Sequence, residues 1–379
     1  MSYTLTEEQQ LIQQTAREFA QEYVVPSVAE CDKTGVHPAE VIKKMAEYDF
    51  LGLYLPGEYG GAEAGYLSYI LTVEELAKVS GAVAAILVNH ASAAAYAVSR
   101  WGSDAQKKSW LTAMAKGDIL GGVAGLEPGA APGAGADRVV AVREGDTYNL
   151  TGMKTYVANG GAAGVYIVFA VTNPEAGAKG LSAFIVDAKA AGLKVNRLIG
   201  KMGLRGCQWA ELVFDNVKVP AAGLLGGEGA GAAMLAEIQA VTGVAEGAIV
   251  VGIAQAAMED AAKYGKQRIQ FGRPITSFPA IQAMLADMAA NIHLTRLAVY
   301  HAADLVDKGE KFAVEAAIIR LFAGRIGTSA LIDVIQIEGG YGYSEEMAAS
   351  RFYRDVQGVI LKNSSADFPE KTIVAEVLA

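Results

Sequence analysis

The order of helix-like and strand-like segments constrains the fold of this chain more than any other feature of its sequence. Apolar residues recur at helical spacing up to about residue 117, beginning after Thr6-Glu7-Glu8-Gln9, which has the pattern of a capping box. Short runs of β-type residues, separated by Gly, Pro and Asp, follow up to about residue 225. From about Gly231 the chain returns to long Ala-rich helical stretches, which Gly272-Arg273-Pro274 interrupts.

We therefore expect a mostly α-helical fold with an inserted β domain: a helical domain over residues 1–117, a small antiparallel β domain over 118–226, and a second helical domain over 227–379. The expected strands cover residues 148–150, 165–171, 181–186, 212–214 and 217–219. A length of 379 residues exceeds what one hydrophobic core usually holds, which also indicates two or three domains.

Composition narrows the functional classes. Hydrophobic residues make up 52% of the chain and charged residues 19%, so it can bury sizeable cores. A net charge of −9 without a cluster of Lys or Arg argues against nucleic acid or an anionic membrane as the main partner. Cys31 and Cys207 are too few for a disulfide framework and lack metal-ligand spacing, which favours a reducing compartment. Without a signal-peptide pattern or an uninterrupted apolar run of about 18 residues, we expect a soluble cytoplasmic protein.

Short motifs occur in a fixed order through all three parts. In chain order they include Pro56-Gly-Glu-Tyr-Gly60-Gly61, Trp101-Gly-Ser-Asp-Ala-Gln106-Lys107, Asn159-Gly160-Gly161, Lys201-Met-Gly203-Leu-Arg205, Gln267-Arg268-Ile-Gln-Phe271-Gly272, Gln336-Ile-Glu-Gly339-Gly340 and Arg354-Asp355. Each motif is weak alone, but together they resemble the acyl-CoA dehydrogenase family over residues 5–373. The resemblance implies a middle β-barrel or sandwich that carries the flavin face, and a C-terminal four-helix bundle that binds FAD and acyl-CoA and forms the oligomer.

A flavin that carries a pyrophosphate needs backbone donors that approach closely and at least one cation. Gly339-Gly340 and the Arg at the end of a helix, Arg268, can supply them. The resemblance implies that Arg268, Phe271, Gln336, Gly339 and Gly340 contact FAD, some of them from a neighbouring subunit. It also implies non-covalent FAD in a homotetramer built from closed dimers.

The resemblance places the flavin ring against the middle domain. The contacts implied there are Gly125, Leu126, Pro132, Tyr156 and Ala158, with Ser365 from the C-terminal part. Tyr156 can stack on the ring. Leu126 and Ala158 stand where the family commonly has hydroxyl donors to the pyrimidine edge and to N5. We expect these losses to alter flavin potential more than FAD binding.

The usual catalytic base of the family is missing. Asn363 lies nine residues after Arg354, where the family commonly has the Glu that removes the α-proton of a CoA thioester, and an amide cannot take a proton. A known family variant places the Glu on the long helix before Gly252, at the position of Thr242, and the Arg that usually follows is Gly243. Both known base positions are therefore inert near pH 7.

Glu246 is the best replacement, because it lies one turn beyond Thr242 and shares its face if the helix is unbroken. The helical phase turns Glu246 away from the polar stripe of this helix and toward apolar residues such as Ile249. A carboxylate buried there is costly unless it is paired or used in chemistry. The alternative is a structural Glu that reaches solvent through the gaps at Gly243 and Gly247, or that pairs with a Lys.

The second candidate base is His90, which follows Asn89 in a segment that the resemblance places along the acyl cavity. A purely structural His is the alternative. The candidate substrate-binding residues are Asn89, Thr242, Glu246 and Lys362.

The resemblance implies an FAD-dependent enzyme that desaturates a CoA thioester, by proton abstraction and hydride transfer to flavin N5, and passes electrons to an electron-transfer flavoprotein. The absence of the α-carbon base resembles family members that desaturate alicyclic acyl-CoA esters, so the resemblance favours a substrate such as a cyclohexane or cyclohexene carboxyl ester. One alternative is an enoyl-CoA reductase that works with an electron-transfer flavoprotein. Another is a flavin-binding interaction protein without turnover.

Overall fold

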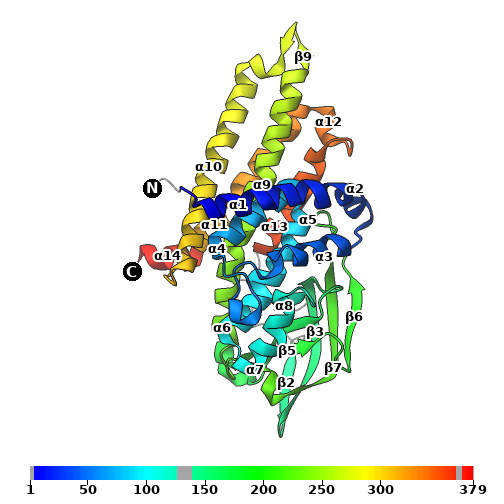
Figure 1. The fold of residues 1–379 in the computed structure, drawn as a ribbon, viewed down its shortest axis with the longest axis vertical. Helices are drawn as coiled ribbons and strands as arrows, with labels where there is room; N and C mark the ends of the chain where they lie inside the picture. Colours follow the sequence, from blue (N-terminus) through cyan, green and yellow to red (C-terminus); the bar gives the residue numbers. More distant parts are fainter. Residues whose placement is uncertain (1–3, 126–138, 364–368, 379) are drawn as a thin grey trace.

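The computed structural model describes residues 4–125, 139–363 and 369–378, apart from the side chains of residues 362 and 363. Figure 1 shows an elongated molecule with the β-sheet at one end and the long helices α9 (Gly231–Gln267) and α10 (Pro279–Asp307) reaching a small hairpin at the other. The N-terminal helices lie across the middle of this view. The predicted fold, mostly helical with an inserted β domain, is confirmed.

The N-terminal part consists of helices packed around two buried ones. Thr6 caps the first helix, since its Oγ1 accepts a hydrogen bond from the N–H of Gln9 (3.2 Å), and the predicted capping box is confirmed. Helices α4 and α5 are buried almost all round: α5 is apolar throughout, whereas α4 also buries Glu74 and Glu75, which pair with Arg296 and Arg17. The helices are α1 (Glu7–Phe19), α2 (Val25–Thr34), α3 (Ala39–Glu47), α4 (Tyr66–Val79), α5 (Gly81–Val88), α6 (Tyr96–Trp101), α7 (Asp104–Gln106) and α8 (Thr112–Ala115), with π-helical turns η1 (Ala20–Val24), η4 (Asn89–Ala95) and η5 (Lys107–Leu111) and 3₁₀ turns η2 (Phe50–Gly52) and η3 (Gly57–Tyr59).

The middle part forms a sheet with the strand order β6-β7-β3-β2-β4-β5-β8, and β1 pairs with β4. Most neighbours are antiparallel, as predicted, but β4 is parallel to β1 and to the first residue of β2. The strands are β1 (Gly121–Ala124), β2 (Val140–Glu144), β3 (Thr147–Ala158), β4 (Val165–Val171), β5 (Leu181–Asp187), β6 (Leu193–Leu198), β7 (Trp209–Pro220) and β8 (Leu224–Leu225), with 3₁₀ turns η6 (Pro174–Gly180) and η7 (Ala221–Gly223). The sequence predicted segments of β3, β4, β5 and β7 and missed the other strands.

The missed strands have weak local signals. Strand β1 begins with two glycines, and β6 at the sheet edge is mostly exposed. Strand β1 forms by pairing with β4, which is remote in sequence, and β6 forms by pairing with β7. Local propensity carries little of that information.

The C-terminal part is a helical bundle built on α9 and α10. The predicted break at residues 272–274 is a two-stranded hairpin, β9 (Ile269–Gln270) and β10 (Arg273–Pro274), whose turn residues Phe271 and Gly272 both have positive φ (52° and 78°). The remaining elements are η8 (Ile275–Ser277), α11 (Ala313–Glu338), α12 (Gly340–Tyr343), α13 (Ala348–Asn363) and α14 (Pro369–Val377).

Two helical stretches, Gly81–Trp101 and Gly231–Gln267, are long and apolar enough to cross a membrane by length and composition, which the sequence analysis did not anticipate. In their most apolar windows, 94% and 83% of the residues are buried inside the protein. Burial on all sides explains such composition in a core helix.

The segment after β6 docks against α13 and joins the middle part to the C-terminal part. The N–H of Leu204 donates to Asp355 Oδ1 (2.6 Å), and Arg354 Nη1 donates to the carbonyl of Met202 (2.9 Å). Arg354 also pairs with Asp32 of α2, where Nη1 and Oδ1 are 2.8 Å apart. This junction fixes Leu204 beside the cavity described next.

Candidate active site

A small cavity lies where the three parts of the chain meet. It is lined by Ala85, Val88, Asn89, Leu204, Trp209, Glu246, Ile249 and Val359. These residues come from α5 and η4, from the segment around the start of β7, from α9 and from α13. The cavity has a volume of about 10 Å³, roughly the space of one water molecule. Among these eight described residues only Glu246 has an acid–base side chain.

The predicted burial of Glu246 on α9 is confirmed, since its residue is only 4% exposed. A Cβ at Gly243 would lie 2.8 Å from Arg320 Cδ, and a Cβ at Gly247 would lie 2.9 Å from Val299 Cγ2. Side chains of the neighbouring helices therefore fill the gaps at Gly243 and Gly247. A purely structural Glu246 was expected to reach solvent through these gaps, and they are closed. Glu246 is instead one of the residues of the cavity wall.

A network of hydroxyl groups lies close to Glu246. Ser92 Oγ donates to the hydroxyl oxygen of Tyr69 (2.8 Å), and the hydroxyl of Tyr66 donates to the carbonyl of Val241 on α9 (2.8 Å). Burial, and secondarily the nearby Glu246 carboxylate, raise the pKa of Tyr69. These contacts tie α4, η4 and α9 together, so the side of the cavity that carries Glu246 is held in place.

The geometry of His90 argues against a role as base. Its Nδ1 accepts a hydrogen bond from the N–H of Gly121 (3.0 Å), which fixes the proton on Nε2 and lets Nε2 donate to the carbonyl of Met114 (3.2 Å). The residue is fully buried, and burial lowers the pKa of His90 to about 4. Both ring nitrogens are engaged, so His90 connects η4 to β1 and to α8.

The two polar neighbours of Glu246 in the predicted set are both buried. Asn89 lines the cavity and donates from Nδ2 to the carbonyl of Ala85 (2.6 Å). Thr242 is on α9 one turn before Glu246, and its hydroxyl donates to the carbonyl of Ile238 (2.8 Å). The hydroxyl proton of Thr242 is therefore used in a bond to the backbone of its own helix. Toward the cavity, the hydroxyl oxygen can only accept a hydrogen bond.

Several predicted site residues lie outside the described part of the chain. They are Leu126, Pro132 and Ser365, together with the side chains of Lys362 and Asn363. The backbone of Asn363 is described, and it forms the last residue of α13.

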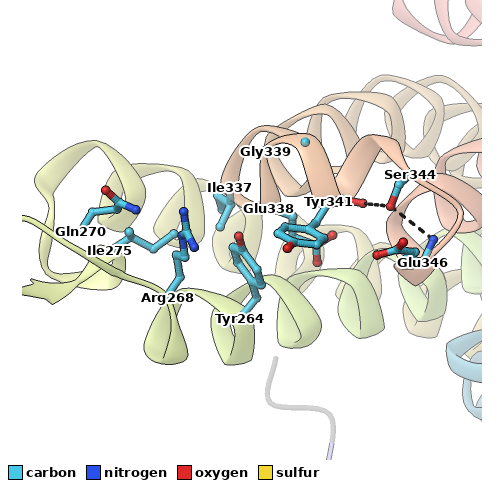
Figure 2. Close-up of a pocket in the computed structure, with 11 residues that line it drawn as sticks. Tyr264, Arg268, Gln270, Ile275, Ile337, Glu338, Gly339, Tyr341, Ser344 and Glu346 are labelled. Carbon is cyan, nitrogen blue, oxygen red and sulfur yellow. Dashed lines mark hydrogen bonds between the residues drawn. The ribbon is translucent and has the colours of Figure 1, made fainter.

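The predicted FAD contacts of the C-terminal part gather at the far end of the bundle. Arg268, Gly339 and Gly340 line a pocket of about 560 Å³, a size typical of ligand sites. Figure 2 shows Tyr264 on α9 and Arg268, the residue directly after this helix, facing the residues at the end of α11 and in α12. At Gly339 φ is +63°, and a Cβ on either glycine would meet nothing within 4 Å, so their backbone is open to a ligand.

Phe271 and Gln336 belong to the same end of the molecule but not to the wall of this pocket. Phe271, at the hairpin turn, is 93% exposed, and Gln336 is exposed on α11. An aromatic side chain this exposed is suited to contact another molecule.

Glu338 is a polar residue of this pocket that the sequence analysis missed. Its residue is 2% exposed, and neither carboxyl oxygen has a hydrogen-bond partner in the described structure. Burial, and then the nearby Asp260, raise the pKa of Glu338 to about 7. A sequence signal existed, because Glu338 follows the buried residues Val334 and Ile337 at helical spacing.

We expect Glu338→Gln to stabilise the flavin-loaded protein at pH 8 but not at pH 5. The pKa of Glu338 rises from 4.5 to about 7 on folding, so the folded protein keeps a proton that the unfolded chain releases between these values. The free energy of unfolding therefore falls as pH rises from 4.5 to about 7, by on the order of 2 kcal/mol, and Gln removes this loss. Urea denaturation at both pH values measures the difference. The exposed Glu346, changed to Gln, is the control, and an equal gain at pH 5 and pH 8 would contradict the assignment.

The predicted flavin contacts of the middle part lie on β3 or just beyond β1. Tyr156 has φ of +53° at an irregularity in the pairing of β3 with β7, and it is 52% exposed. Ala158 is buried two residues further on, and the carbonyl of Gly125 accepts a hydrogen bond from Lys154 Nζ (3.4 Å). An exposed aromatic side chain in such a backbone conformation fits a stacking surface for a planar ligand.

Figure 1 separates the two predicted groups of FAD contacts. The β9–β10 hairpin and α12 lie at or near one end of the molecule, whereas β3 lies toward the other. Both groups fit parts of one dinucleotide, since the first offers a cation and open glycine backbone and the second an aromatic face. Within one chain the two groups lie apart.

The chain combines a helical, sheet and helical architecture with a buried Glu at the junction of its parts and a ligand-sized pocket on its bundle, an arrangement that suits an enzyme. Comparison with known proteins specifies the family. The acyl-CoA dehydrogenase N-terminal, middle and C-terminal domain families match residues 6–118, 126–217 and 227–360. The chain belongs to the acyl-CoA dehydrogenase family.

Individual relatives cover the whole chain. Acryloyl-CoA reductase (NADH) of Anaerotignum propionicum is 37% identical over 380 residues, which span 100% of this chain and 96% of the relative. Butyryl-CoA dehydrogenase from Megasphaera elsdenii has a similar structure, with a TM-score of 0.97, 36% identity and full coverage of both chains. A chain from work on the electron transferring flavoprotein of Acidaminococcus fermentans and flavin-based electron bifurcation has a TM-score of 0.97, 37% identity and full coverage of both.

Membership confirms the predicted class. The protein is an FAD-dependent oxidoreductase that acts on CH–CH groups.

Proposed function

We propose that the protein desaturates a CoA thioester and that Glu246 is the base that removes the substrate proton. The observation that supports this proposal is the position of Glu246: a buried carboxyl group in the wall of a cavity to which all three parts of the chain contribute. Asn363 and Thr242, at the usual base positions, carry an amide and a hydroxyl that do not accept a proton near pH 7. A general base contributes ~10²–10⁴-fold to such a reaction.

The residues around Glu246 give its cavity a mostly apolar wall. Ile249 and Val359 present apolar surface beside the carboxyl group, and Asn89 adds one polar group. The fixed contacts between α4, η4 and α9 hold the helix that carries Glu246. Desaturation removes one hydrogen as a proton and the second as a hydride. FAD, when bound, would supply the acceptor for this hydride.

We propose an alicyclic acyl-CoA, such as a cyclohexane or cyclohexene carboxyl ester, as the substrate class. The support is that both usual positions of the α-carbon base, Asn363 and Thr242, lack a carboxylate, a loss that resembles family members acting on alicyclic acyl-CoA esters.

FAD binding is proposed to need two copies of the chain. Tyr156 and Ala158 would hold the flavin ring of one copy, and Arg268, Phe271 and Gly339 of a second copy would hold its pyrophosphate. The exposed Phe271 and the separation of the two groups in Figure 1 support this arrangement. We propose a homotetramer of closed dimers, and light scattering of the flavin-loaded protein tests it, since a monomer would exclude shared sites.

The proposed electron acceptor is an electron-transfer flavoprotein. Similarity to the chain from the Acidaminococcus fermentans work supports this partner. The proposed location is the cytoplasm, for which the buried Cys31 and Cys207, neither of them in a disulfide within the described residues, are the supporting observation.

The second candidate is an enoyl-CoA reductase, and the similarity to acryloyl-CoA reductase favours it specifically. The same residues serve this direction, with Glu246 as the acid that delivers the proton. Only the redox balance between flavin and acyl group distinguishes the two directions.

An anaerobic screen of CoA thioesters against the flavin-loaded protein tests the proposal. We expect a saturated alicyclic ester to bleach the oxidised flavin band, because oxidation of the ester reduces the flavin. The reductase alternative predicts no bleaching by saturated esters and reoxidation of chemically reduced flavin by an unsaturated ester. If no ester changes the redox state in either direction, the protein binds flavin without turnover.

A further inference from the structure

We infer that the indole N–H of Trp209 donates a hydrogen bond to N5 of the flavin ring, in place of the hydroxyl that Ala158 lacks. The inference rests on the proposed function, which places the ring against Tyr156 and Ala158. It adds a residue that neither the motifs nor the family resemblance indicated.

The first observation is an orphaned donor. Trp209 is 5% exposed, its Nε1 is buried, and Nε1 has no hydrogen-bond partner in the described structure. Buried donors are almost always paired, so an unpaired one calls for a ligand or a bound water as its acceptor. The indole N–H can only donate a hydrogen bond, so its partner must be an acceptor atom with a lone pair.

The second observation is the strand register. Ala158 of β3 stands directly opposite Trp209 of β7 in the sheet. Opposite residues of neighbouring strands project from the same face, with Cβ atoms about 4.5–5.5 Å apart. Trp209 is therefore the side chain of β7 that lies next to the space above Ala158.

The packing shows which face this is. Ala158 and Trp209 both belong to the apolar cluster of the helical parts, whereas the adjacent Val157 and Ala210 belong to the core of the sheet domain. The face shared by Ala158 and Trp209 thus looks toward the helices. It also reaches the Glu246 cavity, since Trp209 lines it.

Two neighbours hold the indole ring. The ring of Tyr156 meets it edge-on, with centroids 6.2 Å apart and planes at 85°, and Lys201 Nζ lies 5.5 Å from the centroid of the indole. A ring held on both sides has a fixed direction for its N–H. Tyr156, Ala158 and Trp209 then surround one location with a stacking face, a small side chain and a single donor.

The competing acceptor is the carbonyl oxygen of the thioester, because Trp209 also borders the cavity of Glu246. The register with Ala158 favours the flavin, and the experiment below separates the two acceptors. A donor to N5 acts on the flavin before substrate binds, whereas a donor to the carbonyl acts only with substrate present.

Trp209→Phe keeps an aromatic ring and removes the N–H. In the substrate-free, flavin-loaded protein we expect a shifted visible flavin band, a changed midpoint potential, and a FAD dissociation constant raised ~5–20-fold. Trp110→Phe is the matched control, because Trp110 packs in a separate cluster and should change none of these. Adding Ala158→Thr to Trp209→Phe should recover part of the affinity, since it returns a hydroxyl donor to the same location.

Reconstitution of the parent protein with 5-deaza-FAD, which has carbon in place of N5, avoids dependence on the folding of a variant. The parent should bind 5-deaza-FAD ~5–20-fold more weakly than FAD, and Trp209→Phe should bind both alike. Equal affinity of the parent for both flavins would overturn the inference. So would a Trp209→Phe variant that alters only the KM or kcat for thioesters, which would assign the donor to the acyl carbonyl. Neither result affects bleaching of FAD by a CoA ester, so the proposed function is tested separately.

Discussion

Glu246→Gln is expected to lower the rate of flavin reduction by ~10²-fold or more, while FAD stays bound. The amide keeps the size and hydrogen-bonding shape of the side chain but cannot take a proton. Because the Glu246 cavity contains no other described group that accepts a proton near neutral pH, no neighbour can replace it. Stopped-flow absorbance of the flavin under anaerobic conditions, with the ester that bleaches the parent, measures the rate.

The matched control is Glu259→Gln on the same helix. Glu259 is exposed and accepts a hydrogen bond from Gln255 Nε2 (2.7 Å), which an amide oxygen can also accept. It should leave the rate near that of the parent. A parent-like rate for Glu246→Gln would place the base elsewhere. Both nitrogens of His90 are already engaged in hydrogen bonds, so His90 would not be the replacement.

The fold could be predicted where the signal is local and repeated. The helical phase of α9 placed Glu246 on the buried face, and the structure confirms it, because a long helix repeats the same geometry at every turn. The strands β3, β4, β5 and β7 carry enough apolar residues to be recognised. Strands β1 and β6 depend on their partners, and their sequences alone do not indicate a strand.

The roles of buried polar side chains were harder to predict, because their partners are distant in sequence. His90 resembles a candidate base until Gly121 and Met114 are seen to engage both nitrogens. The same is true of Trp209. The sequence does not show that it pairs with Ala158 across the sheet or that its indole N–H has no hydrogen-bond partner in the described structure. Sequence spacing gives the face of an element but not which atoms remain unpaired.

Family resemblance predicted the set of FAD contacts, and the structure changes how that set is understood. The β9–β10 hairpin next to Arg268 and strand β3, which carries Tyr156, lie toward different ends of one chain. In the proposed assembly the set would therefore be shared between two copies, which the order of residues in one sequence does not reveal.

Gly203→Ala is expected to destabilise the flavin-loaded protein by on the order of 3 kcal/mol and to slow flavin reduction as well. A Cβ at Gly203 would overlap the carbonyl group of Arg354 and lie 2.6 Å from the N of Asp355. Both are backbone atoms of α13, so neither can rotate away. The loop would have to separate from the helix, which adds the cost of overpacking to the loss of a buried hydrogen bond to a carboxylate.

The effect should reach the active site because the next residue is Leu204, which lines the Glu246 cavity. Leu204 has φ of +51°, an unfavourable conformation for this residue that its N–H bond to Asp355 Oδ1 (2.6 Å) helps to hold. Once Gly203 moves, that constraint is released and the cavity wall shifts. Gly200→Ala is the control in the same segment, since a Cβ there meets nothing within 4 Å. Urea denaturation followed by flavin fluorescence compares the two variants, and equal midpoints would show that the contact between this loop and α13 does not hold the three parts together.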